Sequence, residues 1–311
     1  TADKIYVLQG NVVVDQGSTL TVEPGTTVLA ESDVWMRVDG ALVADGTAEA
    51  PISFLGATET VTGTLPWAGL RFSDKGDPSL VDGDGTHVAG SILRHVHIED
   101  AKTGVGVSGT DLYIAHAVIA QGGSYNHMGM YEYSGIAVGD GGSATVVDAH
   151  ITENGSGIYA ASSRVNVLRT TLTKNGTGIW ADDSILVLTD STVSDNQYAG
   201  VGGYGWQGSS LIARHNVVVG NGSDGISFEG ESTVEGNLIA NNGGRGLGLG
   251  LNASAHSQND PAIAFNTTTG EYLVAWQEYD YVSQAIVGRR VSRDGTVAED
   301  DLVIAATSLE E

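Results

Sequence analysis

The chain has 311 residues, of which 44 are Gly, 5 are Pro and none is Cys, and its formal charge is −24. Without cysteine it forms no disulfide and no thiolate metal site. A charge this negative excludes general nucleic-acid binding, which relies on Lys and Arg to replace counterions. No run of about 18 apolar residues occurs, so we expect no membrane-spanning helix. The first residues lack the basic start and apolar stretch of a signal peptide.

Short alternating apolar segments, separated by Gly, Asn, Asp and Ser, begin near the N-terminus and continue along most of the chain. Early examples are residues 12–14, 20–22, 27–29, 52–54 and 70–72. This period-two pattern with turn residues between the segments is typical of β-strands. No window shows convincing helical spacing of apolar residues. The sequence therefore predicts an all-β fold.

Residues 73–87 interrupt the strand pattern with an acidic, glycine-rich segment. Its aspartates that offer carboxylate oxygens are Asp74, Asp77, Asp82 and Asp84. Carboxylate oxygens are ligands that Ca²⁺ prefers, and the Asp-Gly-Asp-Gly run can bend tightly enough to bring them together. The segment lacks the EF-hand spacing, and a solvated acidic loop is the simpler interpretation. Ca²⁺ is the one cofactor that the sequence suggests.

A repeat of about 21 residues appears in the second half of the chain. Residues 151–158 (Ile-Thr-Glu-Asn-Gly-Ser-Gly-Ile) recur closely as residues 172–179. The repeated asparagine falls at Asn154, Asn175, Asn196, Asn221 and Asn242. Gln121 is assigned to the same slot upstream. A fixed period of this length, with two or three short strands per repeat, indicates a solenoid, because one such unit cannot bury its apolar side alone.

The repeat predicts a parallel β-helix whose coils stack about 4.8 Å apart. The alternation directs one apolar set into the core: Ile158, Ala160, Ile179, Ala181, Ile226, Phe228, Leu247 and Leu249. The repeated asparagines can hydrogen-bond one another from coil to coil, which satisfies backbone groups at the turns.

These Asn-x-x-Gly-Ile coils, preceded by residues 20–28 and 40–47, resemble right-handed parallel β-helix proteins of the pectate-lyase-like superfamily. The resemblance extends over about residues 4–250. It implies the fold but leaves the function open, because the superfamily includes lyases, hydrolases, esterases, tailspikes and non-catalytic surface proteins.

The chain divides into a β-helix over residues 1–252, with cap strands at its N-terminal end, a linker over 253–259 and two hairpins over 260–311. Asp294-Gly295 supplies the turn of the second hairpin. The hairpins resemble a single blade-like repeat of large secreted bacterial proteins. Four strands are marginally stable alone, so we expect them to form a small antiparallel cap on the last coil.

Two insertions, within residues 122–133 and 197–207, lengthen the coils. Both are placed between the asparagine slot and the following strand, which predicts two loop walls on one side of the solenoid. Between these walls, Tyr159 and Trp180 form the floor of the expected trough. The walls supply Tyr125, His127, Tyr131, Tyr133, Tyr198, Tyr204 and Trp206. Flat amphipathic rings suit the mixed faces of sugars; the alternative is a ledge on which the loops pack.

Evidence for catalysis is weak. In the position before each Gly-Ile strand, Asp224 is the one acidic residue, and Glu132 lies about four coils or 19 Å away. Glycosidase carboxylates lie about 5–9.5 Å apart. The Arg-x-Pro-x-x-Arg pattern of pectate lyases and the Asp-Pro-His pattern of epimerases are absent. The remaining catalytic candidates are Glu153, Lys174, Asp182, Asp183 and Asp195.

The sequence thus favours an extracellular or cell-surface β-helix protein that recognises a polysaccharide or a surface partner through an aromatic trough. The first alternative is a polysaccharide lyase or glycoside hydrolase with a non-standard site. The second is a structural, filament or adhesion subunit that self-associates.

Overall fold

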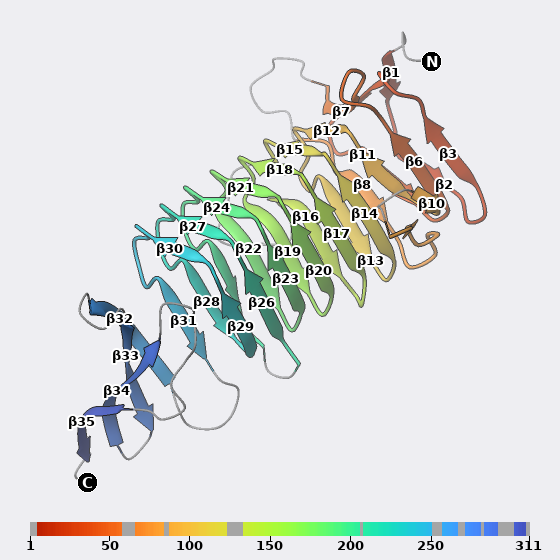
Figure 1. Cartoon of the computed structure of the whole chain (residues 1–311). Helices are drawn as coiled ribbons and strands as arrows, with labels where there is room; N and C mark the ends of the chain where they lie inside the picture. The colour runs from red at the N-terminus through yellow and green to blue at the C-terminus, as the bar shows by residue number, and fades with distance from the viewer. Residues whose placement is uncertain are drawn as a thin grey trace.

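The computed structural model describes residues 5–57, 66–83, 87–122, 133–205, 208–250, 257–266, 271–280, 283–291 and 302–308. The chain winds through three parallel sheets, which we call A, B and C, and each coil adds one strand to each sheet (Figure 1). No α-helix occurs among the described residues, and none of them belongs to a helix that could cross a membrane. The predicted parallel β-helix is confirmed.

Sheet A starts with the first strand of the chain. Its strands are β1 (Ile5–Leu8), β4 (Thr27–Ala30), β7 (Ile52–Gly56), β12 (Val96–Glu99), β15 (Val118–Ala120), β18 (His150–Thr152), β21 (Thr171–Thr173), β24 (Thr192–Ser194), β27 (Val217–Val219) and β30 (Leu238–Ala240). The expected N-terminal cap strands pair in the same parallel sheets as the coils that follow them.

Sheet B carries the longest strands in the middle of the solenoid. Its parallel part consists of β2 (Val12–Val14), β5 (Trp35–Val38), β8 (Gly69–Phe72), β13 (Val105–Ser108), β16 (Ser134–Gly139), β19 (Ser156–Ala161), β22 (Thr177–Asp182), β25 (Val201–Gly203), β28 (Ile226–Glu229) and β31 (Leu247–Gly250).

Sheet C completes each coil. It contains β3 (Thr19–Val22), β6 (Ala41–Asp45), β11 (Ile92–Arg94), β14 (Asp111–Ala115), β17 (Ser143–Val147), β20 (Arg164–Leu168), β23 (Ile185–Thr189), β26 (Ser210–Arg214) and β29 (Glu231–Glu235). A separate antiparallel pair, β9 (Leu80–Val81) and β10 (His87–Ala89), projects from the insertion between β8 and β11.

Four antiparallel strands extend sheet B beyond the last coil. They are β32 (Ser257–Asn266), β33 (Glu271–Asp280), β34 (Ser283–Val291) and β35 (Leu302–Ser308). β32 attaches through backbone pairing with β31, whereas β29 and β30 are the last strands of their sheets. The small antiparallel element therefore joins the solenoid through one strand edge. The predicted turn at Asp294-Gly295 lies outside the described residues.

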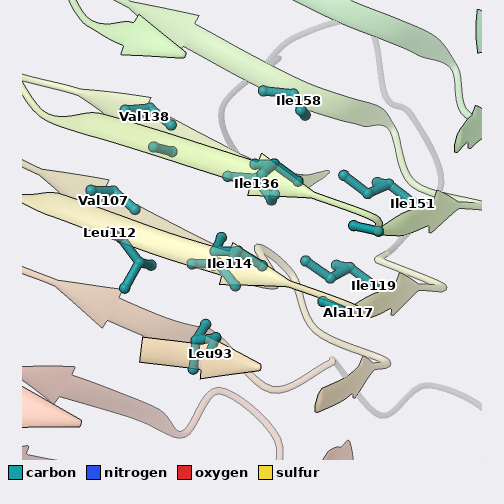
Figure 2. Packing of buried hydrophobic residues seen from close by; sticks show 14 of the residues in the cluster. Leu93, Val107, Leu112, Ile114, Ala117, Ile119, Ile136, Val138, Ile151 and Ile158 are labelled. Atoms are coloured by element: carbon teal, nitrogen blue, oxygen red, sulfur yellow. The ribbon is translucent and has the colours of Figure 1, made fainter. Parts of the chain in front are cut away.

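The core is a stack of aliphatic side chains in register along the axis (Figure 2). Ile136, Ile158 and Ile179 pair on successive strands of sheet B, and each is 0% exposed. β-Branched side chains suit this position because they pack well on a pleated surface that is buried. Leu247 and Leu249, at the C-terminal end, are partly buried against the same core.

The repeated asparagines form a hydrogen-bonded column at the corner between sheets A and B. The backbone N–H of Asn175 donates to Oδ1 of Asn196 at 2.9 Å, and Nδ2 of Asn196 donates to the carbonyl of Leu172 at 3.2 Å. One side chain thus satisfies backbone groups that the corner leaves without strand partners. Upstream, Gly122 occupies the asparagine slot, because its N–H donates to Oδ1 of Asn154 at 3.1 Å.

The assignment of Gln121 to that slot is therefore wrong by one residue. Gln121 has φ +57 and corresponds to Glu153, with φ +59, and to Lys174, with φ +56, which precede the asparagines of their coils. The left-handed backbone makes the turn at this position, and the next residue takes the inward slot. Sequence spacing alone did not separate the two neighbours because the first insertion begins directly after them.

A second polar column, which the repeat analysis did not identify, lies at the corner between sheets C and A. The N–H of Thr170 donates to Oγ of Ser191 at 3.1 Å, that of Ser191 to Oδ1 of Asn216 at 2.9 Å, and that of Asn216 to Oδ1 of Asn237 at 2.9 Å. The column uses three residue types, so no one type marks every coil in the sequence.

The asparagine column predicts a stability cost for Asn196→Ala. The substitution leaves the N–H of Asn175 and the carbonyl of Leu172 buried without this partner, and a lost buried hydrogen-bond partner costs about 1–3 kcal/mol. We expect a loss of that size in urea unfolding. Asn166→Ala is the matched control, since Asn166 makes one long 3.4 Å side-chain bond to Thr145. Equal effects of the two substitutions would contradict the proposed role of the column.

A stacked histidine pair predicts a pH dependence of stability. The rings of His95 and His116 lie 4.6 Å apart at an angle of 7°. Burial, followed by the charges of His116 and Arg94, lowers the pKa of His95 below its ordinary value. The folded state therefore binds protons less readily than the unfolded state, so stability falls as the pH drops through about 6.5, the pKa expected of an unfolded histidine.

The measurement is the melting temperature between pH 8 and pH 5. We expect His95→Asn to weaken the acid-induced decrease, because asparagine tolerates the left-handed backbone of this position, where φ is +49. His215→Asn, at an exposed corner with φ +56, leaves the histidine pair intact and should retain the decrease. An unchanged profile in His95→Asn would show that this pair does not cause it.

Candidate functional site

The outward side chains of sheet B form a continuous surface along the solenoid, because the strands pair in register. From the N-terminal to the C-terminal end, the aligned positions are Val13, Arg37, Arg71, Gly106, Ala137, Tyr159, Trp180, Gly202, Ser227 and Gly248. We call this surface the outer face of sheet B. It begins with Val13 and two cations, continues with two small residues and two aromatic residues, and ends with small residues.

Trp180 and Tyr204 form the aromatic part of this face. Their ring centroids lie 5.2 Å apart at 69°, an edge-to-face contact. The indole of Trp180 extends over the next coil, where an added Cβ on Gly202 would lie 2.6 Å from ring atom Cζ3. Nε1 of Trp180 is buried and has no hydrogen-bond partner, so the indole presents its apolar surface rather than its donor. Tyr204 is 54% exposed.

Asp182 connects two aromatic residues, one on the coil before its own and one on the coil after it. Its Oδ2 accepts a hydrogen bond of 3.3 Å from the hydroxyl of Tyr159, and its Oδ1 accepts one of 3.1 Å from the backbone N–H of Tyr204. Tyr159 itself is only 5% exposed. Tyr159 therefore supports the site from beneath, whereas Trp180 and Tyr204 form its accessible part.

The two insertions lie at opposite ends of the sheet B strands, which corrects the expectation that both precede the strand. The first lies before β16. The second lies mainly after β25: β22 ends at Asp182 and β23 begins at Ile185, whereas β25 ends at Gly203 and β26 begins at Ser210. The pairing of Val201 with Ile179 holds β25 in register and leaves the extra residues to the following corner.

The remaining predicted wall residues are distributed accordingly. Tyr133 precedes β16 and packs over Gly155, and Tyr198 lies in the turn before β25. Both are half-buried at the beginning of their strands, whereas Tyr204 lies beyond the end of β25. Tyr125, His127, Tyr131 and Trp206 lie outside the described residues, so a trough with two walls stays a prediction.

The basic end of the face was not predicted from the sequence. Cζ of Arg37 lies 5.6 Å and Cζ of Arg71 lies 6.0 Å from the centre of the Trp35 ring. Arg37 pairs with Asp39 at 3.0 Å. A hydrogen bond from Ser73, together with Arg37 and against the effect of burial, lowers the pKa of Asp39, so this partner is ionised at neutral pH.

A hollow of about 360 Å³ opens on the face between the basic and aromatic parts. Residues that line it include Arg71, Lys102, Gly106, Ser108, Ala137 and Asp140. It exists because the two outward positions between Arg71 and Tyr159 carry no side chain larger than a methyl group. In the sequence, the alternation around Arg71 indicates that its side chain points outward. The insertions before β11 and β16, however, obscure which strands align with it.

The candidate catalytic residues do not gather at one place. Glu153, Lys174 and Asp195 occupy equivalent, exposed corner positions on three successive coils, each with a positive φ. Asp182 and Asp183 lie at the other end of β22. A strand of six residues separates the ends by roughly 17 Å at about 3.3 Å per residue. The five residues therefore form two separate groups and not one site.

The predicted calcium ligands lie in the insertion before β11. Asp74, Asp77 and Asp82 are exposed, and Asp84 lies outside the described residues. Within the described segments, no group of three or more His, Asp and Glu side chains is arranged to hold a metal ion. Calcium binding by this insertion therefore stays a prediction.

Comparisons with known proteins agree with the fold. Residues 134–275 match the family model of the right handed beta helix region. No curated protein sequence matches the chain.

Solved structures give distant likenesses. The A-module of mannuronan C-5 epimerase AlgE6 from Azotobacter vinelandii has a TM-score of 0.40 and 13% identity over 75% of this chain and 68% of its own. Alginate lyase from Paenibacillus sp. str. FPU-7 has a TM-score of 0.28 and 13% identity over 76% of this chain and 99% of its own.

A third is the tailspike protein gp49 of Acinetobacter baumannii bacteriophage Fri1, a capsular polysaccharide depolymerase. It has a TM-score of 0.19 and 9% identity over 98% of this chain and 80% of its own. The strand pairing and the family-model match make the chain a parallel β-helix protein, and its function has to be argued from its own residues.

The position of the Trp180 indole predicts different effects of the same substitution at two aligned glycines. In Gly202→Ala the new methyl would lie 2.6 Å from the indole, whereas in Gly106→Ala it meets only the Leu70 carbonyl at 3.7 Å. We expect Gly202→Ala to lower the unfolding free energy by about 1–3 kcal/mol through overpacking. Gly106→Ala should be neutral or slightly stabilising. Denaturant unfolding measures both, and similar losses would contradict this placement of the indole.

Proposed function

We propose that the protein binds a polysaccharide along the outer face of sheet B, outside the cell or at its surface. The observation that supports this most directly is the edge-to-face pair of Trp180 and Tyr204, with the carboxylate of Asp182 beside it. Sugar rings have apolar faces that stack on aromatic surfaces and hydroxyl edges that need polar partners. This part of the face offers both kinds of partner within a few ångströms.

The shape of the face favours an extended ligand. Aligned positions follow one another about every 4.8 Å along the axis, and the outward residues beyond Trp180 are Gly202, Ser227 and Gly248. These residues are small, and the surface above them is formed by the Trp180 indole over Gly202 and by the Arg245 guanidinium over Gly248. An elongated glycan can therefore lie along several coils and contact more of the face than a single sugar could.

The net charge restricts the glycan. A polymer with an acidic group on every sugar would be repelled by a protein of charge −24. Near the aromatic pair it would also meet Asp182, which accepts hydrogen bonds from two groups. A polymer composed mainly of neutral sugars avoids both costs.

Recognition rather than catalysis is proposed because of where the ionisable side chains lie. Glu153, Lys174 and Asp195 form a column at the corner before the sheet B strands, whereas the aromatic pair and Asp182 lie toward the other end. Asp224, the acidic residue singled out by the sequence, is paired with Arg245 at 2.8 Å. Burial raises its pKa, but hydrogen bonds and charge from Arg245 outweigh this and lower it, so Asp224 is not a proton donor at neutral pH.

The test is a microarray of plant and microbial polysaccharides probed with wild type, Trp180→Ala and Tyr204→Ala. We expect wild type to bind at least one neutral polymer, and each variant to bind it about tenfold or more weakly through the loss of an aromatic stacking surface. Tyr113→Ala, on β14 of sheet C, is the matched control and should bind like wild type. Absence of wild-type binding, or full binding by Trp180→Ala, would refute the proposal.

A further inference from the structure

The basic end of the outer face contains two arginines, and among the described residues only Arg37 has a carboxylate partner. Arg37 pairs with the ionised carboxylate of Asp39. Within the described part of the chain, the guanidinium of Arg71 contacts the Trp35 ring and has no carboxylate partner. In a chain with 14 basic and 38 acidic residues, an arginine that has no acidic partner among the described residues and lies beside a hollow is a candidate for binding an external anion.

Arg71 is oriented toward that role by its surroundings. Contact with the Trp35 ring restrains the guanidinium, so less side-chain entropy is lost when it binds. A guanidinium also presents a planar set of N–H donors that matches the two oxygens of a carboxylate and those of a sulfate. The hollow of about 360 Å³ next to it lies within the usual range of ligand sites, about 300–1,000 Å³.

The two ends of the hollow differ in chemistry. Lys102 lies just before β13, whereas Ser108 ends β13 and donates a hydrogen bond of 2.6 Å to Oδ2 of Asp140. Gly106 and Ala137 form the small-residue floor between these ends. A sugar placed here would direct an anionic group toward Arg71, and a hydroxyl donor toward Asp140.

We propose that this hollow is a subsite for a single anionic substituent, a carboxylate or a sulfate ester, on one sugar of an otherwise mainly neutral glycan. The proposal rests on the proposed function and specifies the ligand of the same face. The hollow begins at β8, and Tyr159 lies on β19, three coils or about 14 Å further along. The acidic sugar therefore lies several units from the sugar that stacks on Trp180 and Tyr204, and sugars between them are neutral.

The first experiment observes Arg71 itself. Protein labelled with ¹⁵N-arginine is titrated with methyl glucuronide, glucose 6-sulfate or uncharged methyl glucoside, and the Arg71 Nε–H signal is assigned by its loss in Arg71→Gln. We expect saturable shifts of this signal with at least one of the two acidic sugars and none with methyl glucoside. The more effective acidic sugar identifies carboxylate or sulfate as the preferred group. The proposal would be overturned if neither acidic sugar shifts the Arg71 Nε–H signal, or if methyl glucoside shifts it equally.

The second experiment measures binding of gellan, whose repeat carries one carboxylate among neutral sugars, of carboxyl-reduced gellan and of alginate, which carries one on every sugar. We expect gellan to bind about tenfold more tightly than the other two. Arg71→Gln should weaken the binding of gellan to the level seen with carboxyl-reduced gellan. A concentration of 0.5 M NaCl should do the same, because salt screens the charges. Equal binding of gellan and reduced gellan, or tighter binding of alginate, would overturn the proposal.

Two variants separate the subsite from folding and from overall charge. Gly106→Val adds a side chain that fills the hollow, while its Cβ meets nothing closer than the Leu70 carbonyl at 3.7 Å. It should keep the wild-type melting temperature and lose the preference for gellan over reduced gellan. Arg164→Gln removes the same charge from an exposed position on sheet C and should retain the preference; loss of the preference in this variant would overturn the subsite.

The two proposals fail in different ways. If Trp180→Ala weakens the binding of neutral polymers but gellan binds no more tightly than carboxyl-reduced gellan, the subsite is refuted and the proposed function stands. If no polymer binds to wild type, the proposed function fails and the subsite, which rests on it, fails too.

Discussion

In-register pairing between coils is the constraint on which the other features of this protein depend. Each strand of sheet B pairs in parallel with its equivalent on the next coil, so that Ile136, Ile158 and Ile179 lie above one another inside while Ala137, Tyr159 and Trp180 do so outside. One register fixes both surfaces, since successive side chains of a strand point to opposite faces. The core and the outer face are therefore two sides of the same hydrogen-bond pattern.

The corners meet a different requirement. At each corner the backbone leaves its sheet, and its polar groups lose their strand partners at a place where water is excluded. The asparagines at one corner, and the Thr, Ser and Asn residues at another, supply these partners from inside the coil. The residue before each asparagine takes a positive φ and exposes its side chain, so Glu153, Lys174 and Asp195 can vary in charge without affecting the fold.

The sequence predicted the fold well because the repeat carries it. The asparagine period and the apolar alternation of Ile158 and Ile179 identify the coil, the direction of stacking and the buried set. The candidate site was predicted less completely. Tyr159 and Trp180 were predicted on the outer face, but Arg71 and Gly106 were not, because insertions change the residue spacing between the coils that carry them. The position of the second insertion was also not predicted, because it depends on the pairing of Val201 with Ile179, which residue spacing alone does not reveal.

The second insertion also bears on how such a protein can diversify. A coil contacts only its neighbours, and Val201 stays opposite Ile179 although this coil is longer than the one before it. Corner length and coil register are thus independent variables. Descendants of one solenoid can acquire, exchange or shed a corner loop in a single genetic event while inheriting the scaffold unchanged, so ligand preference in such lineages is free to change faster than architecture.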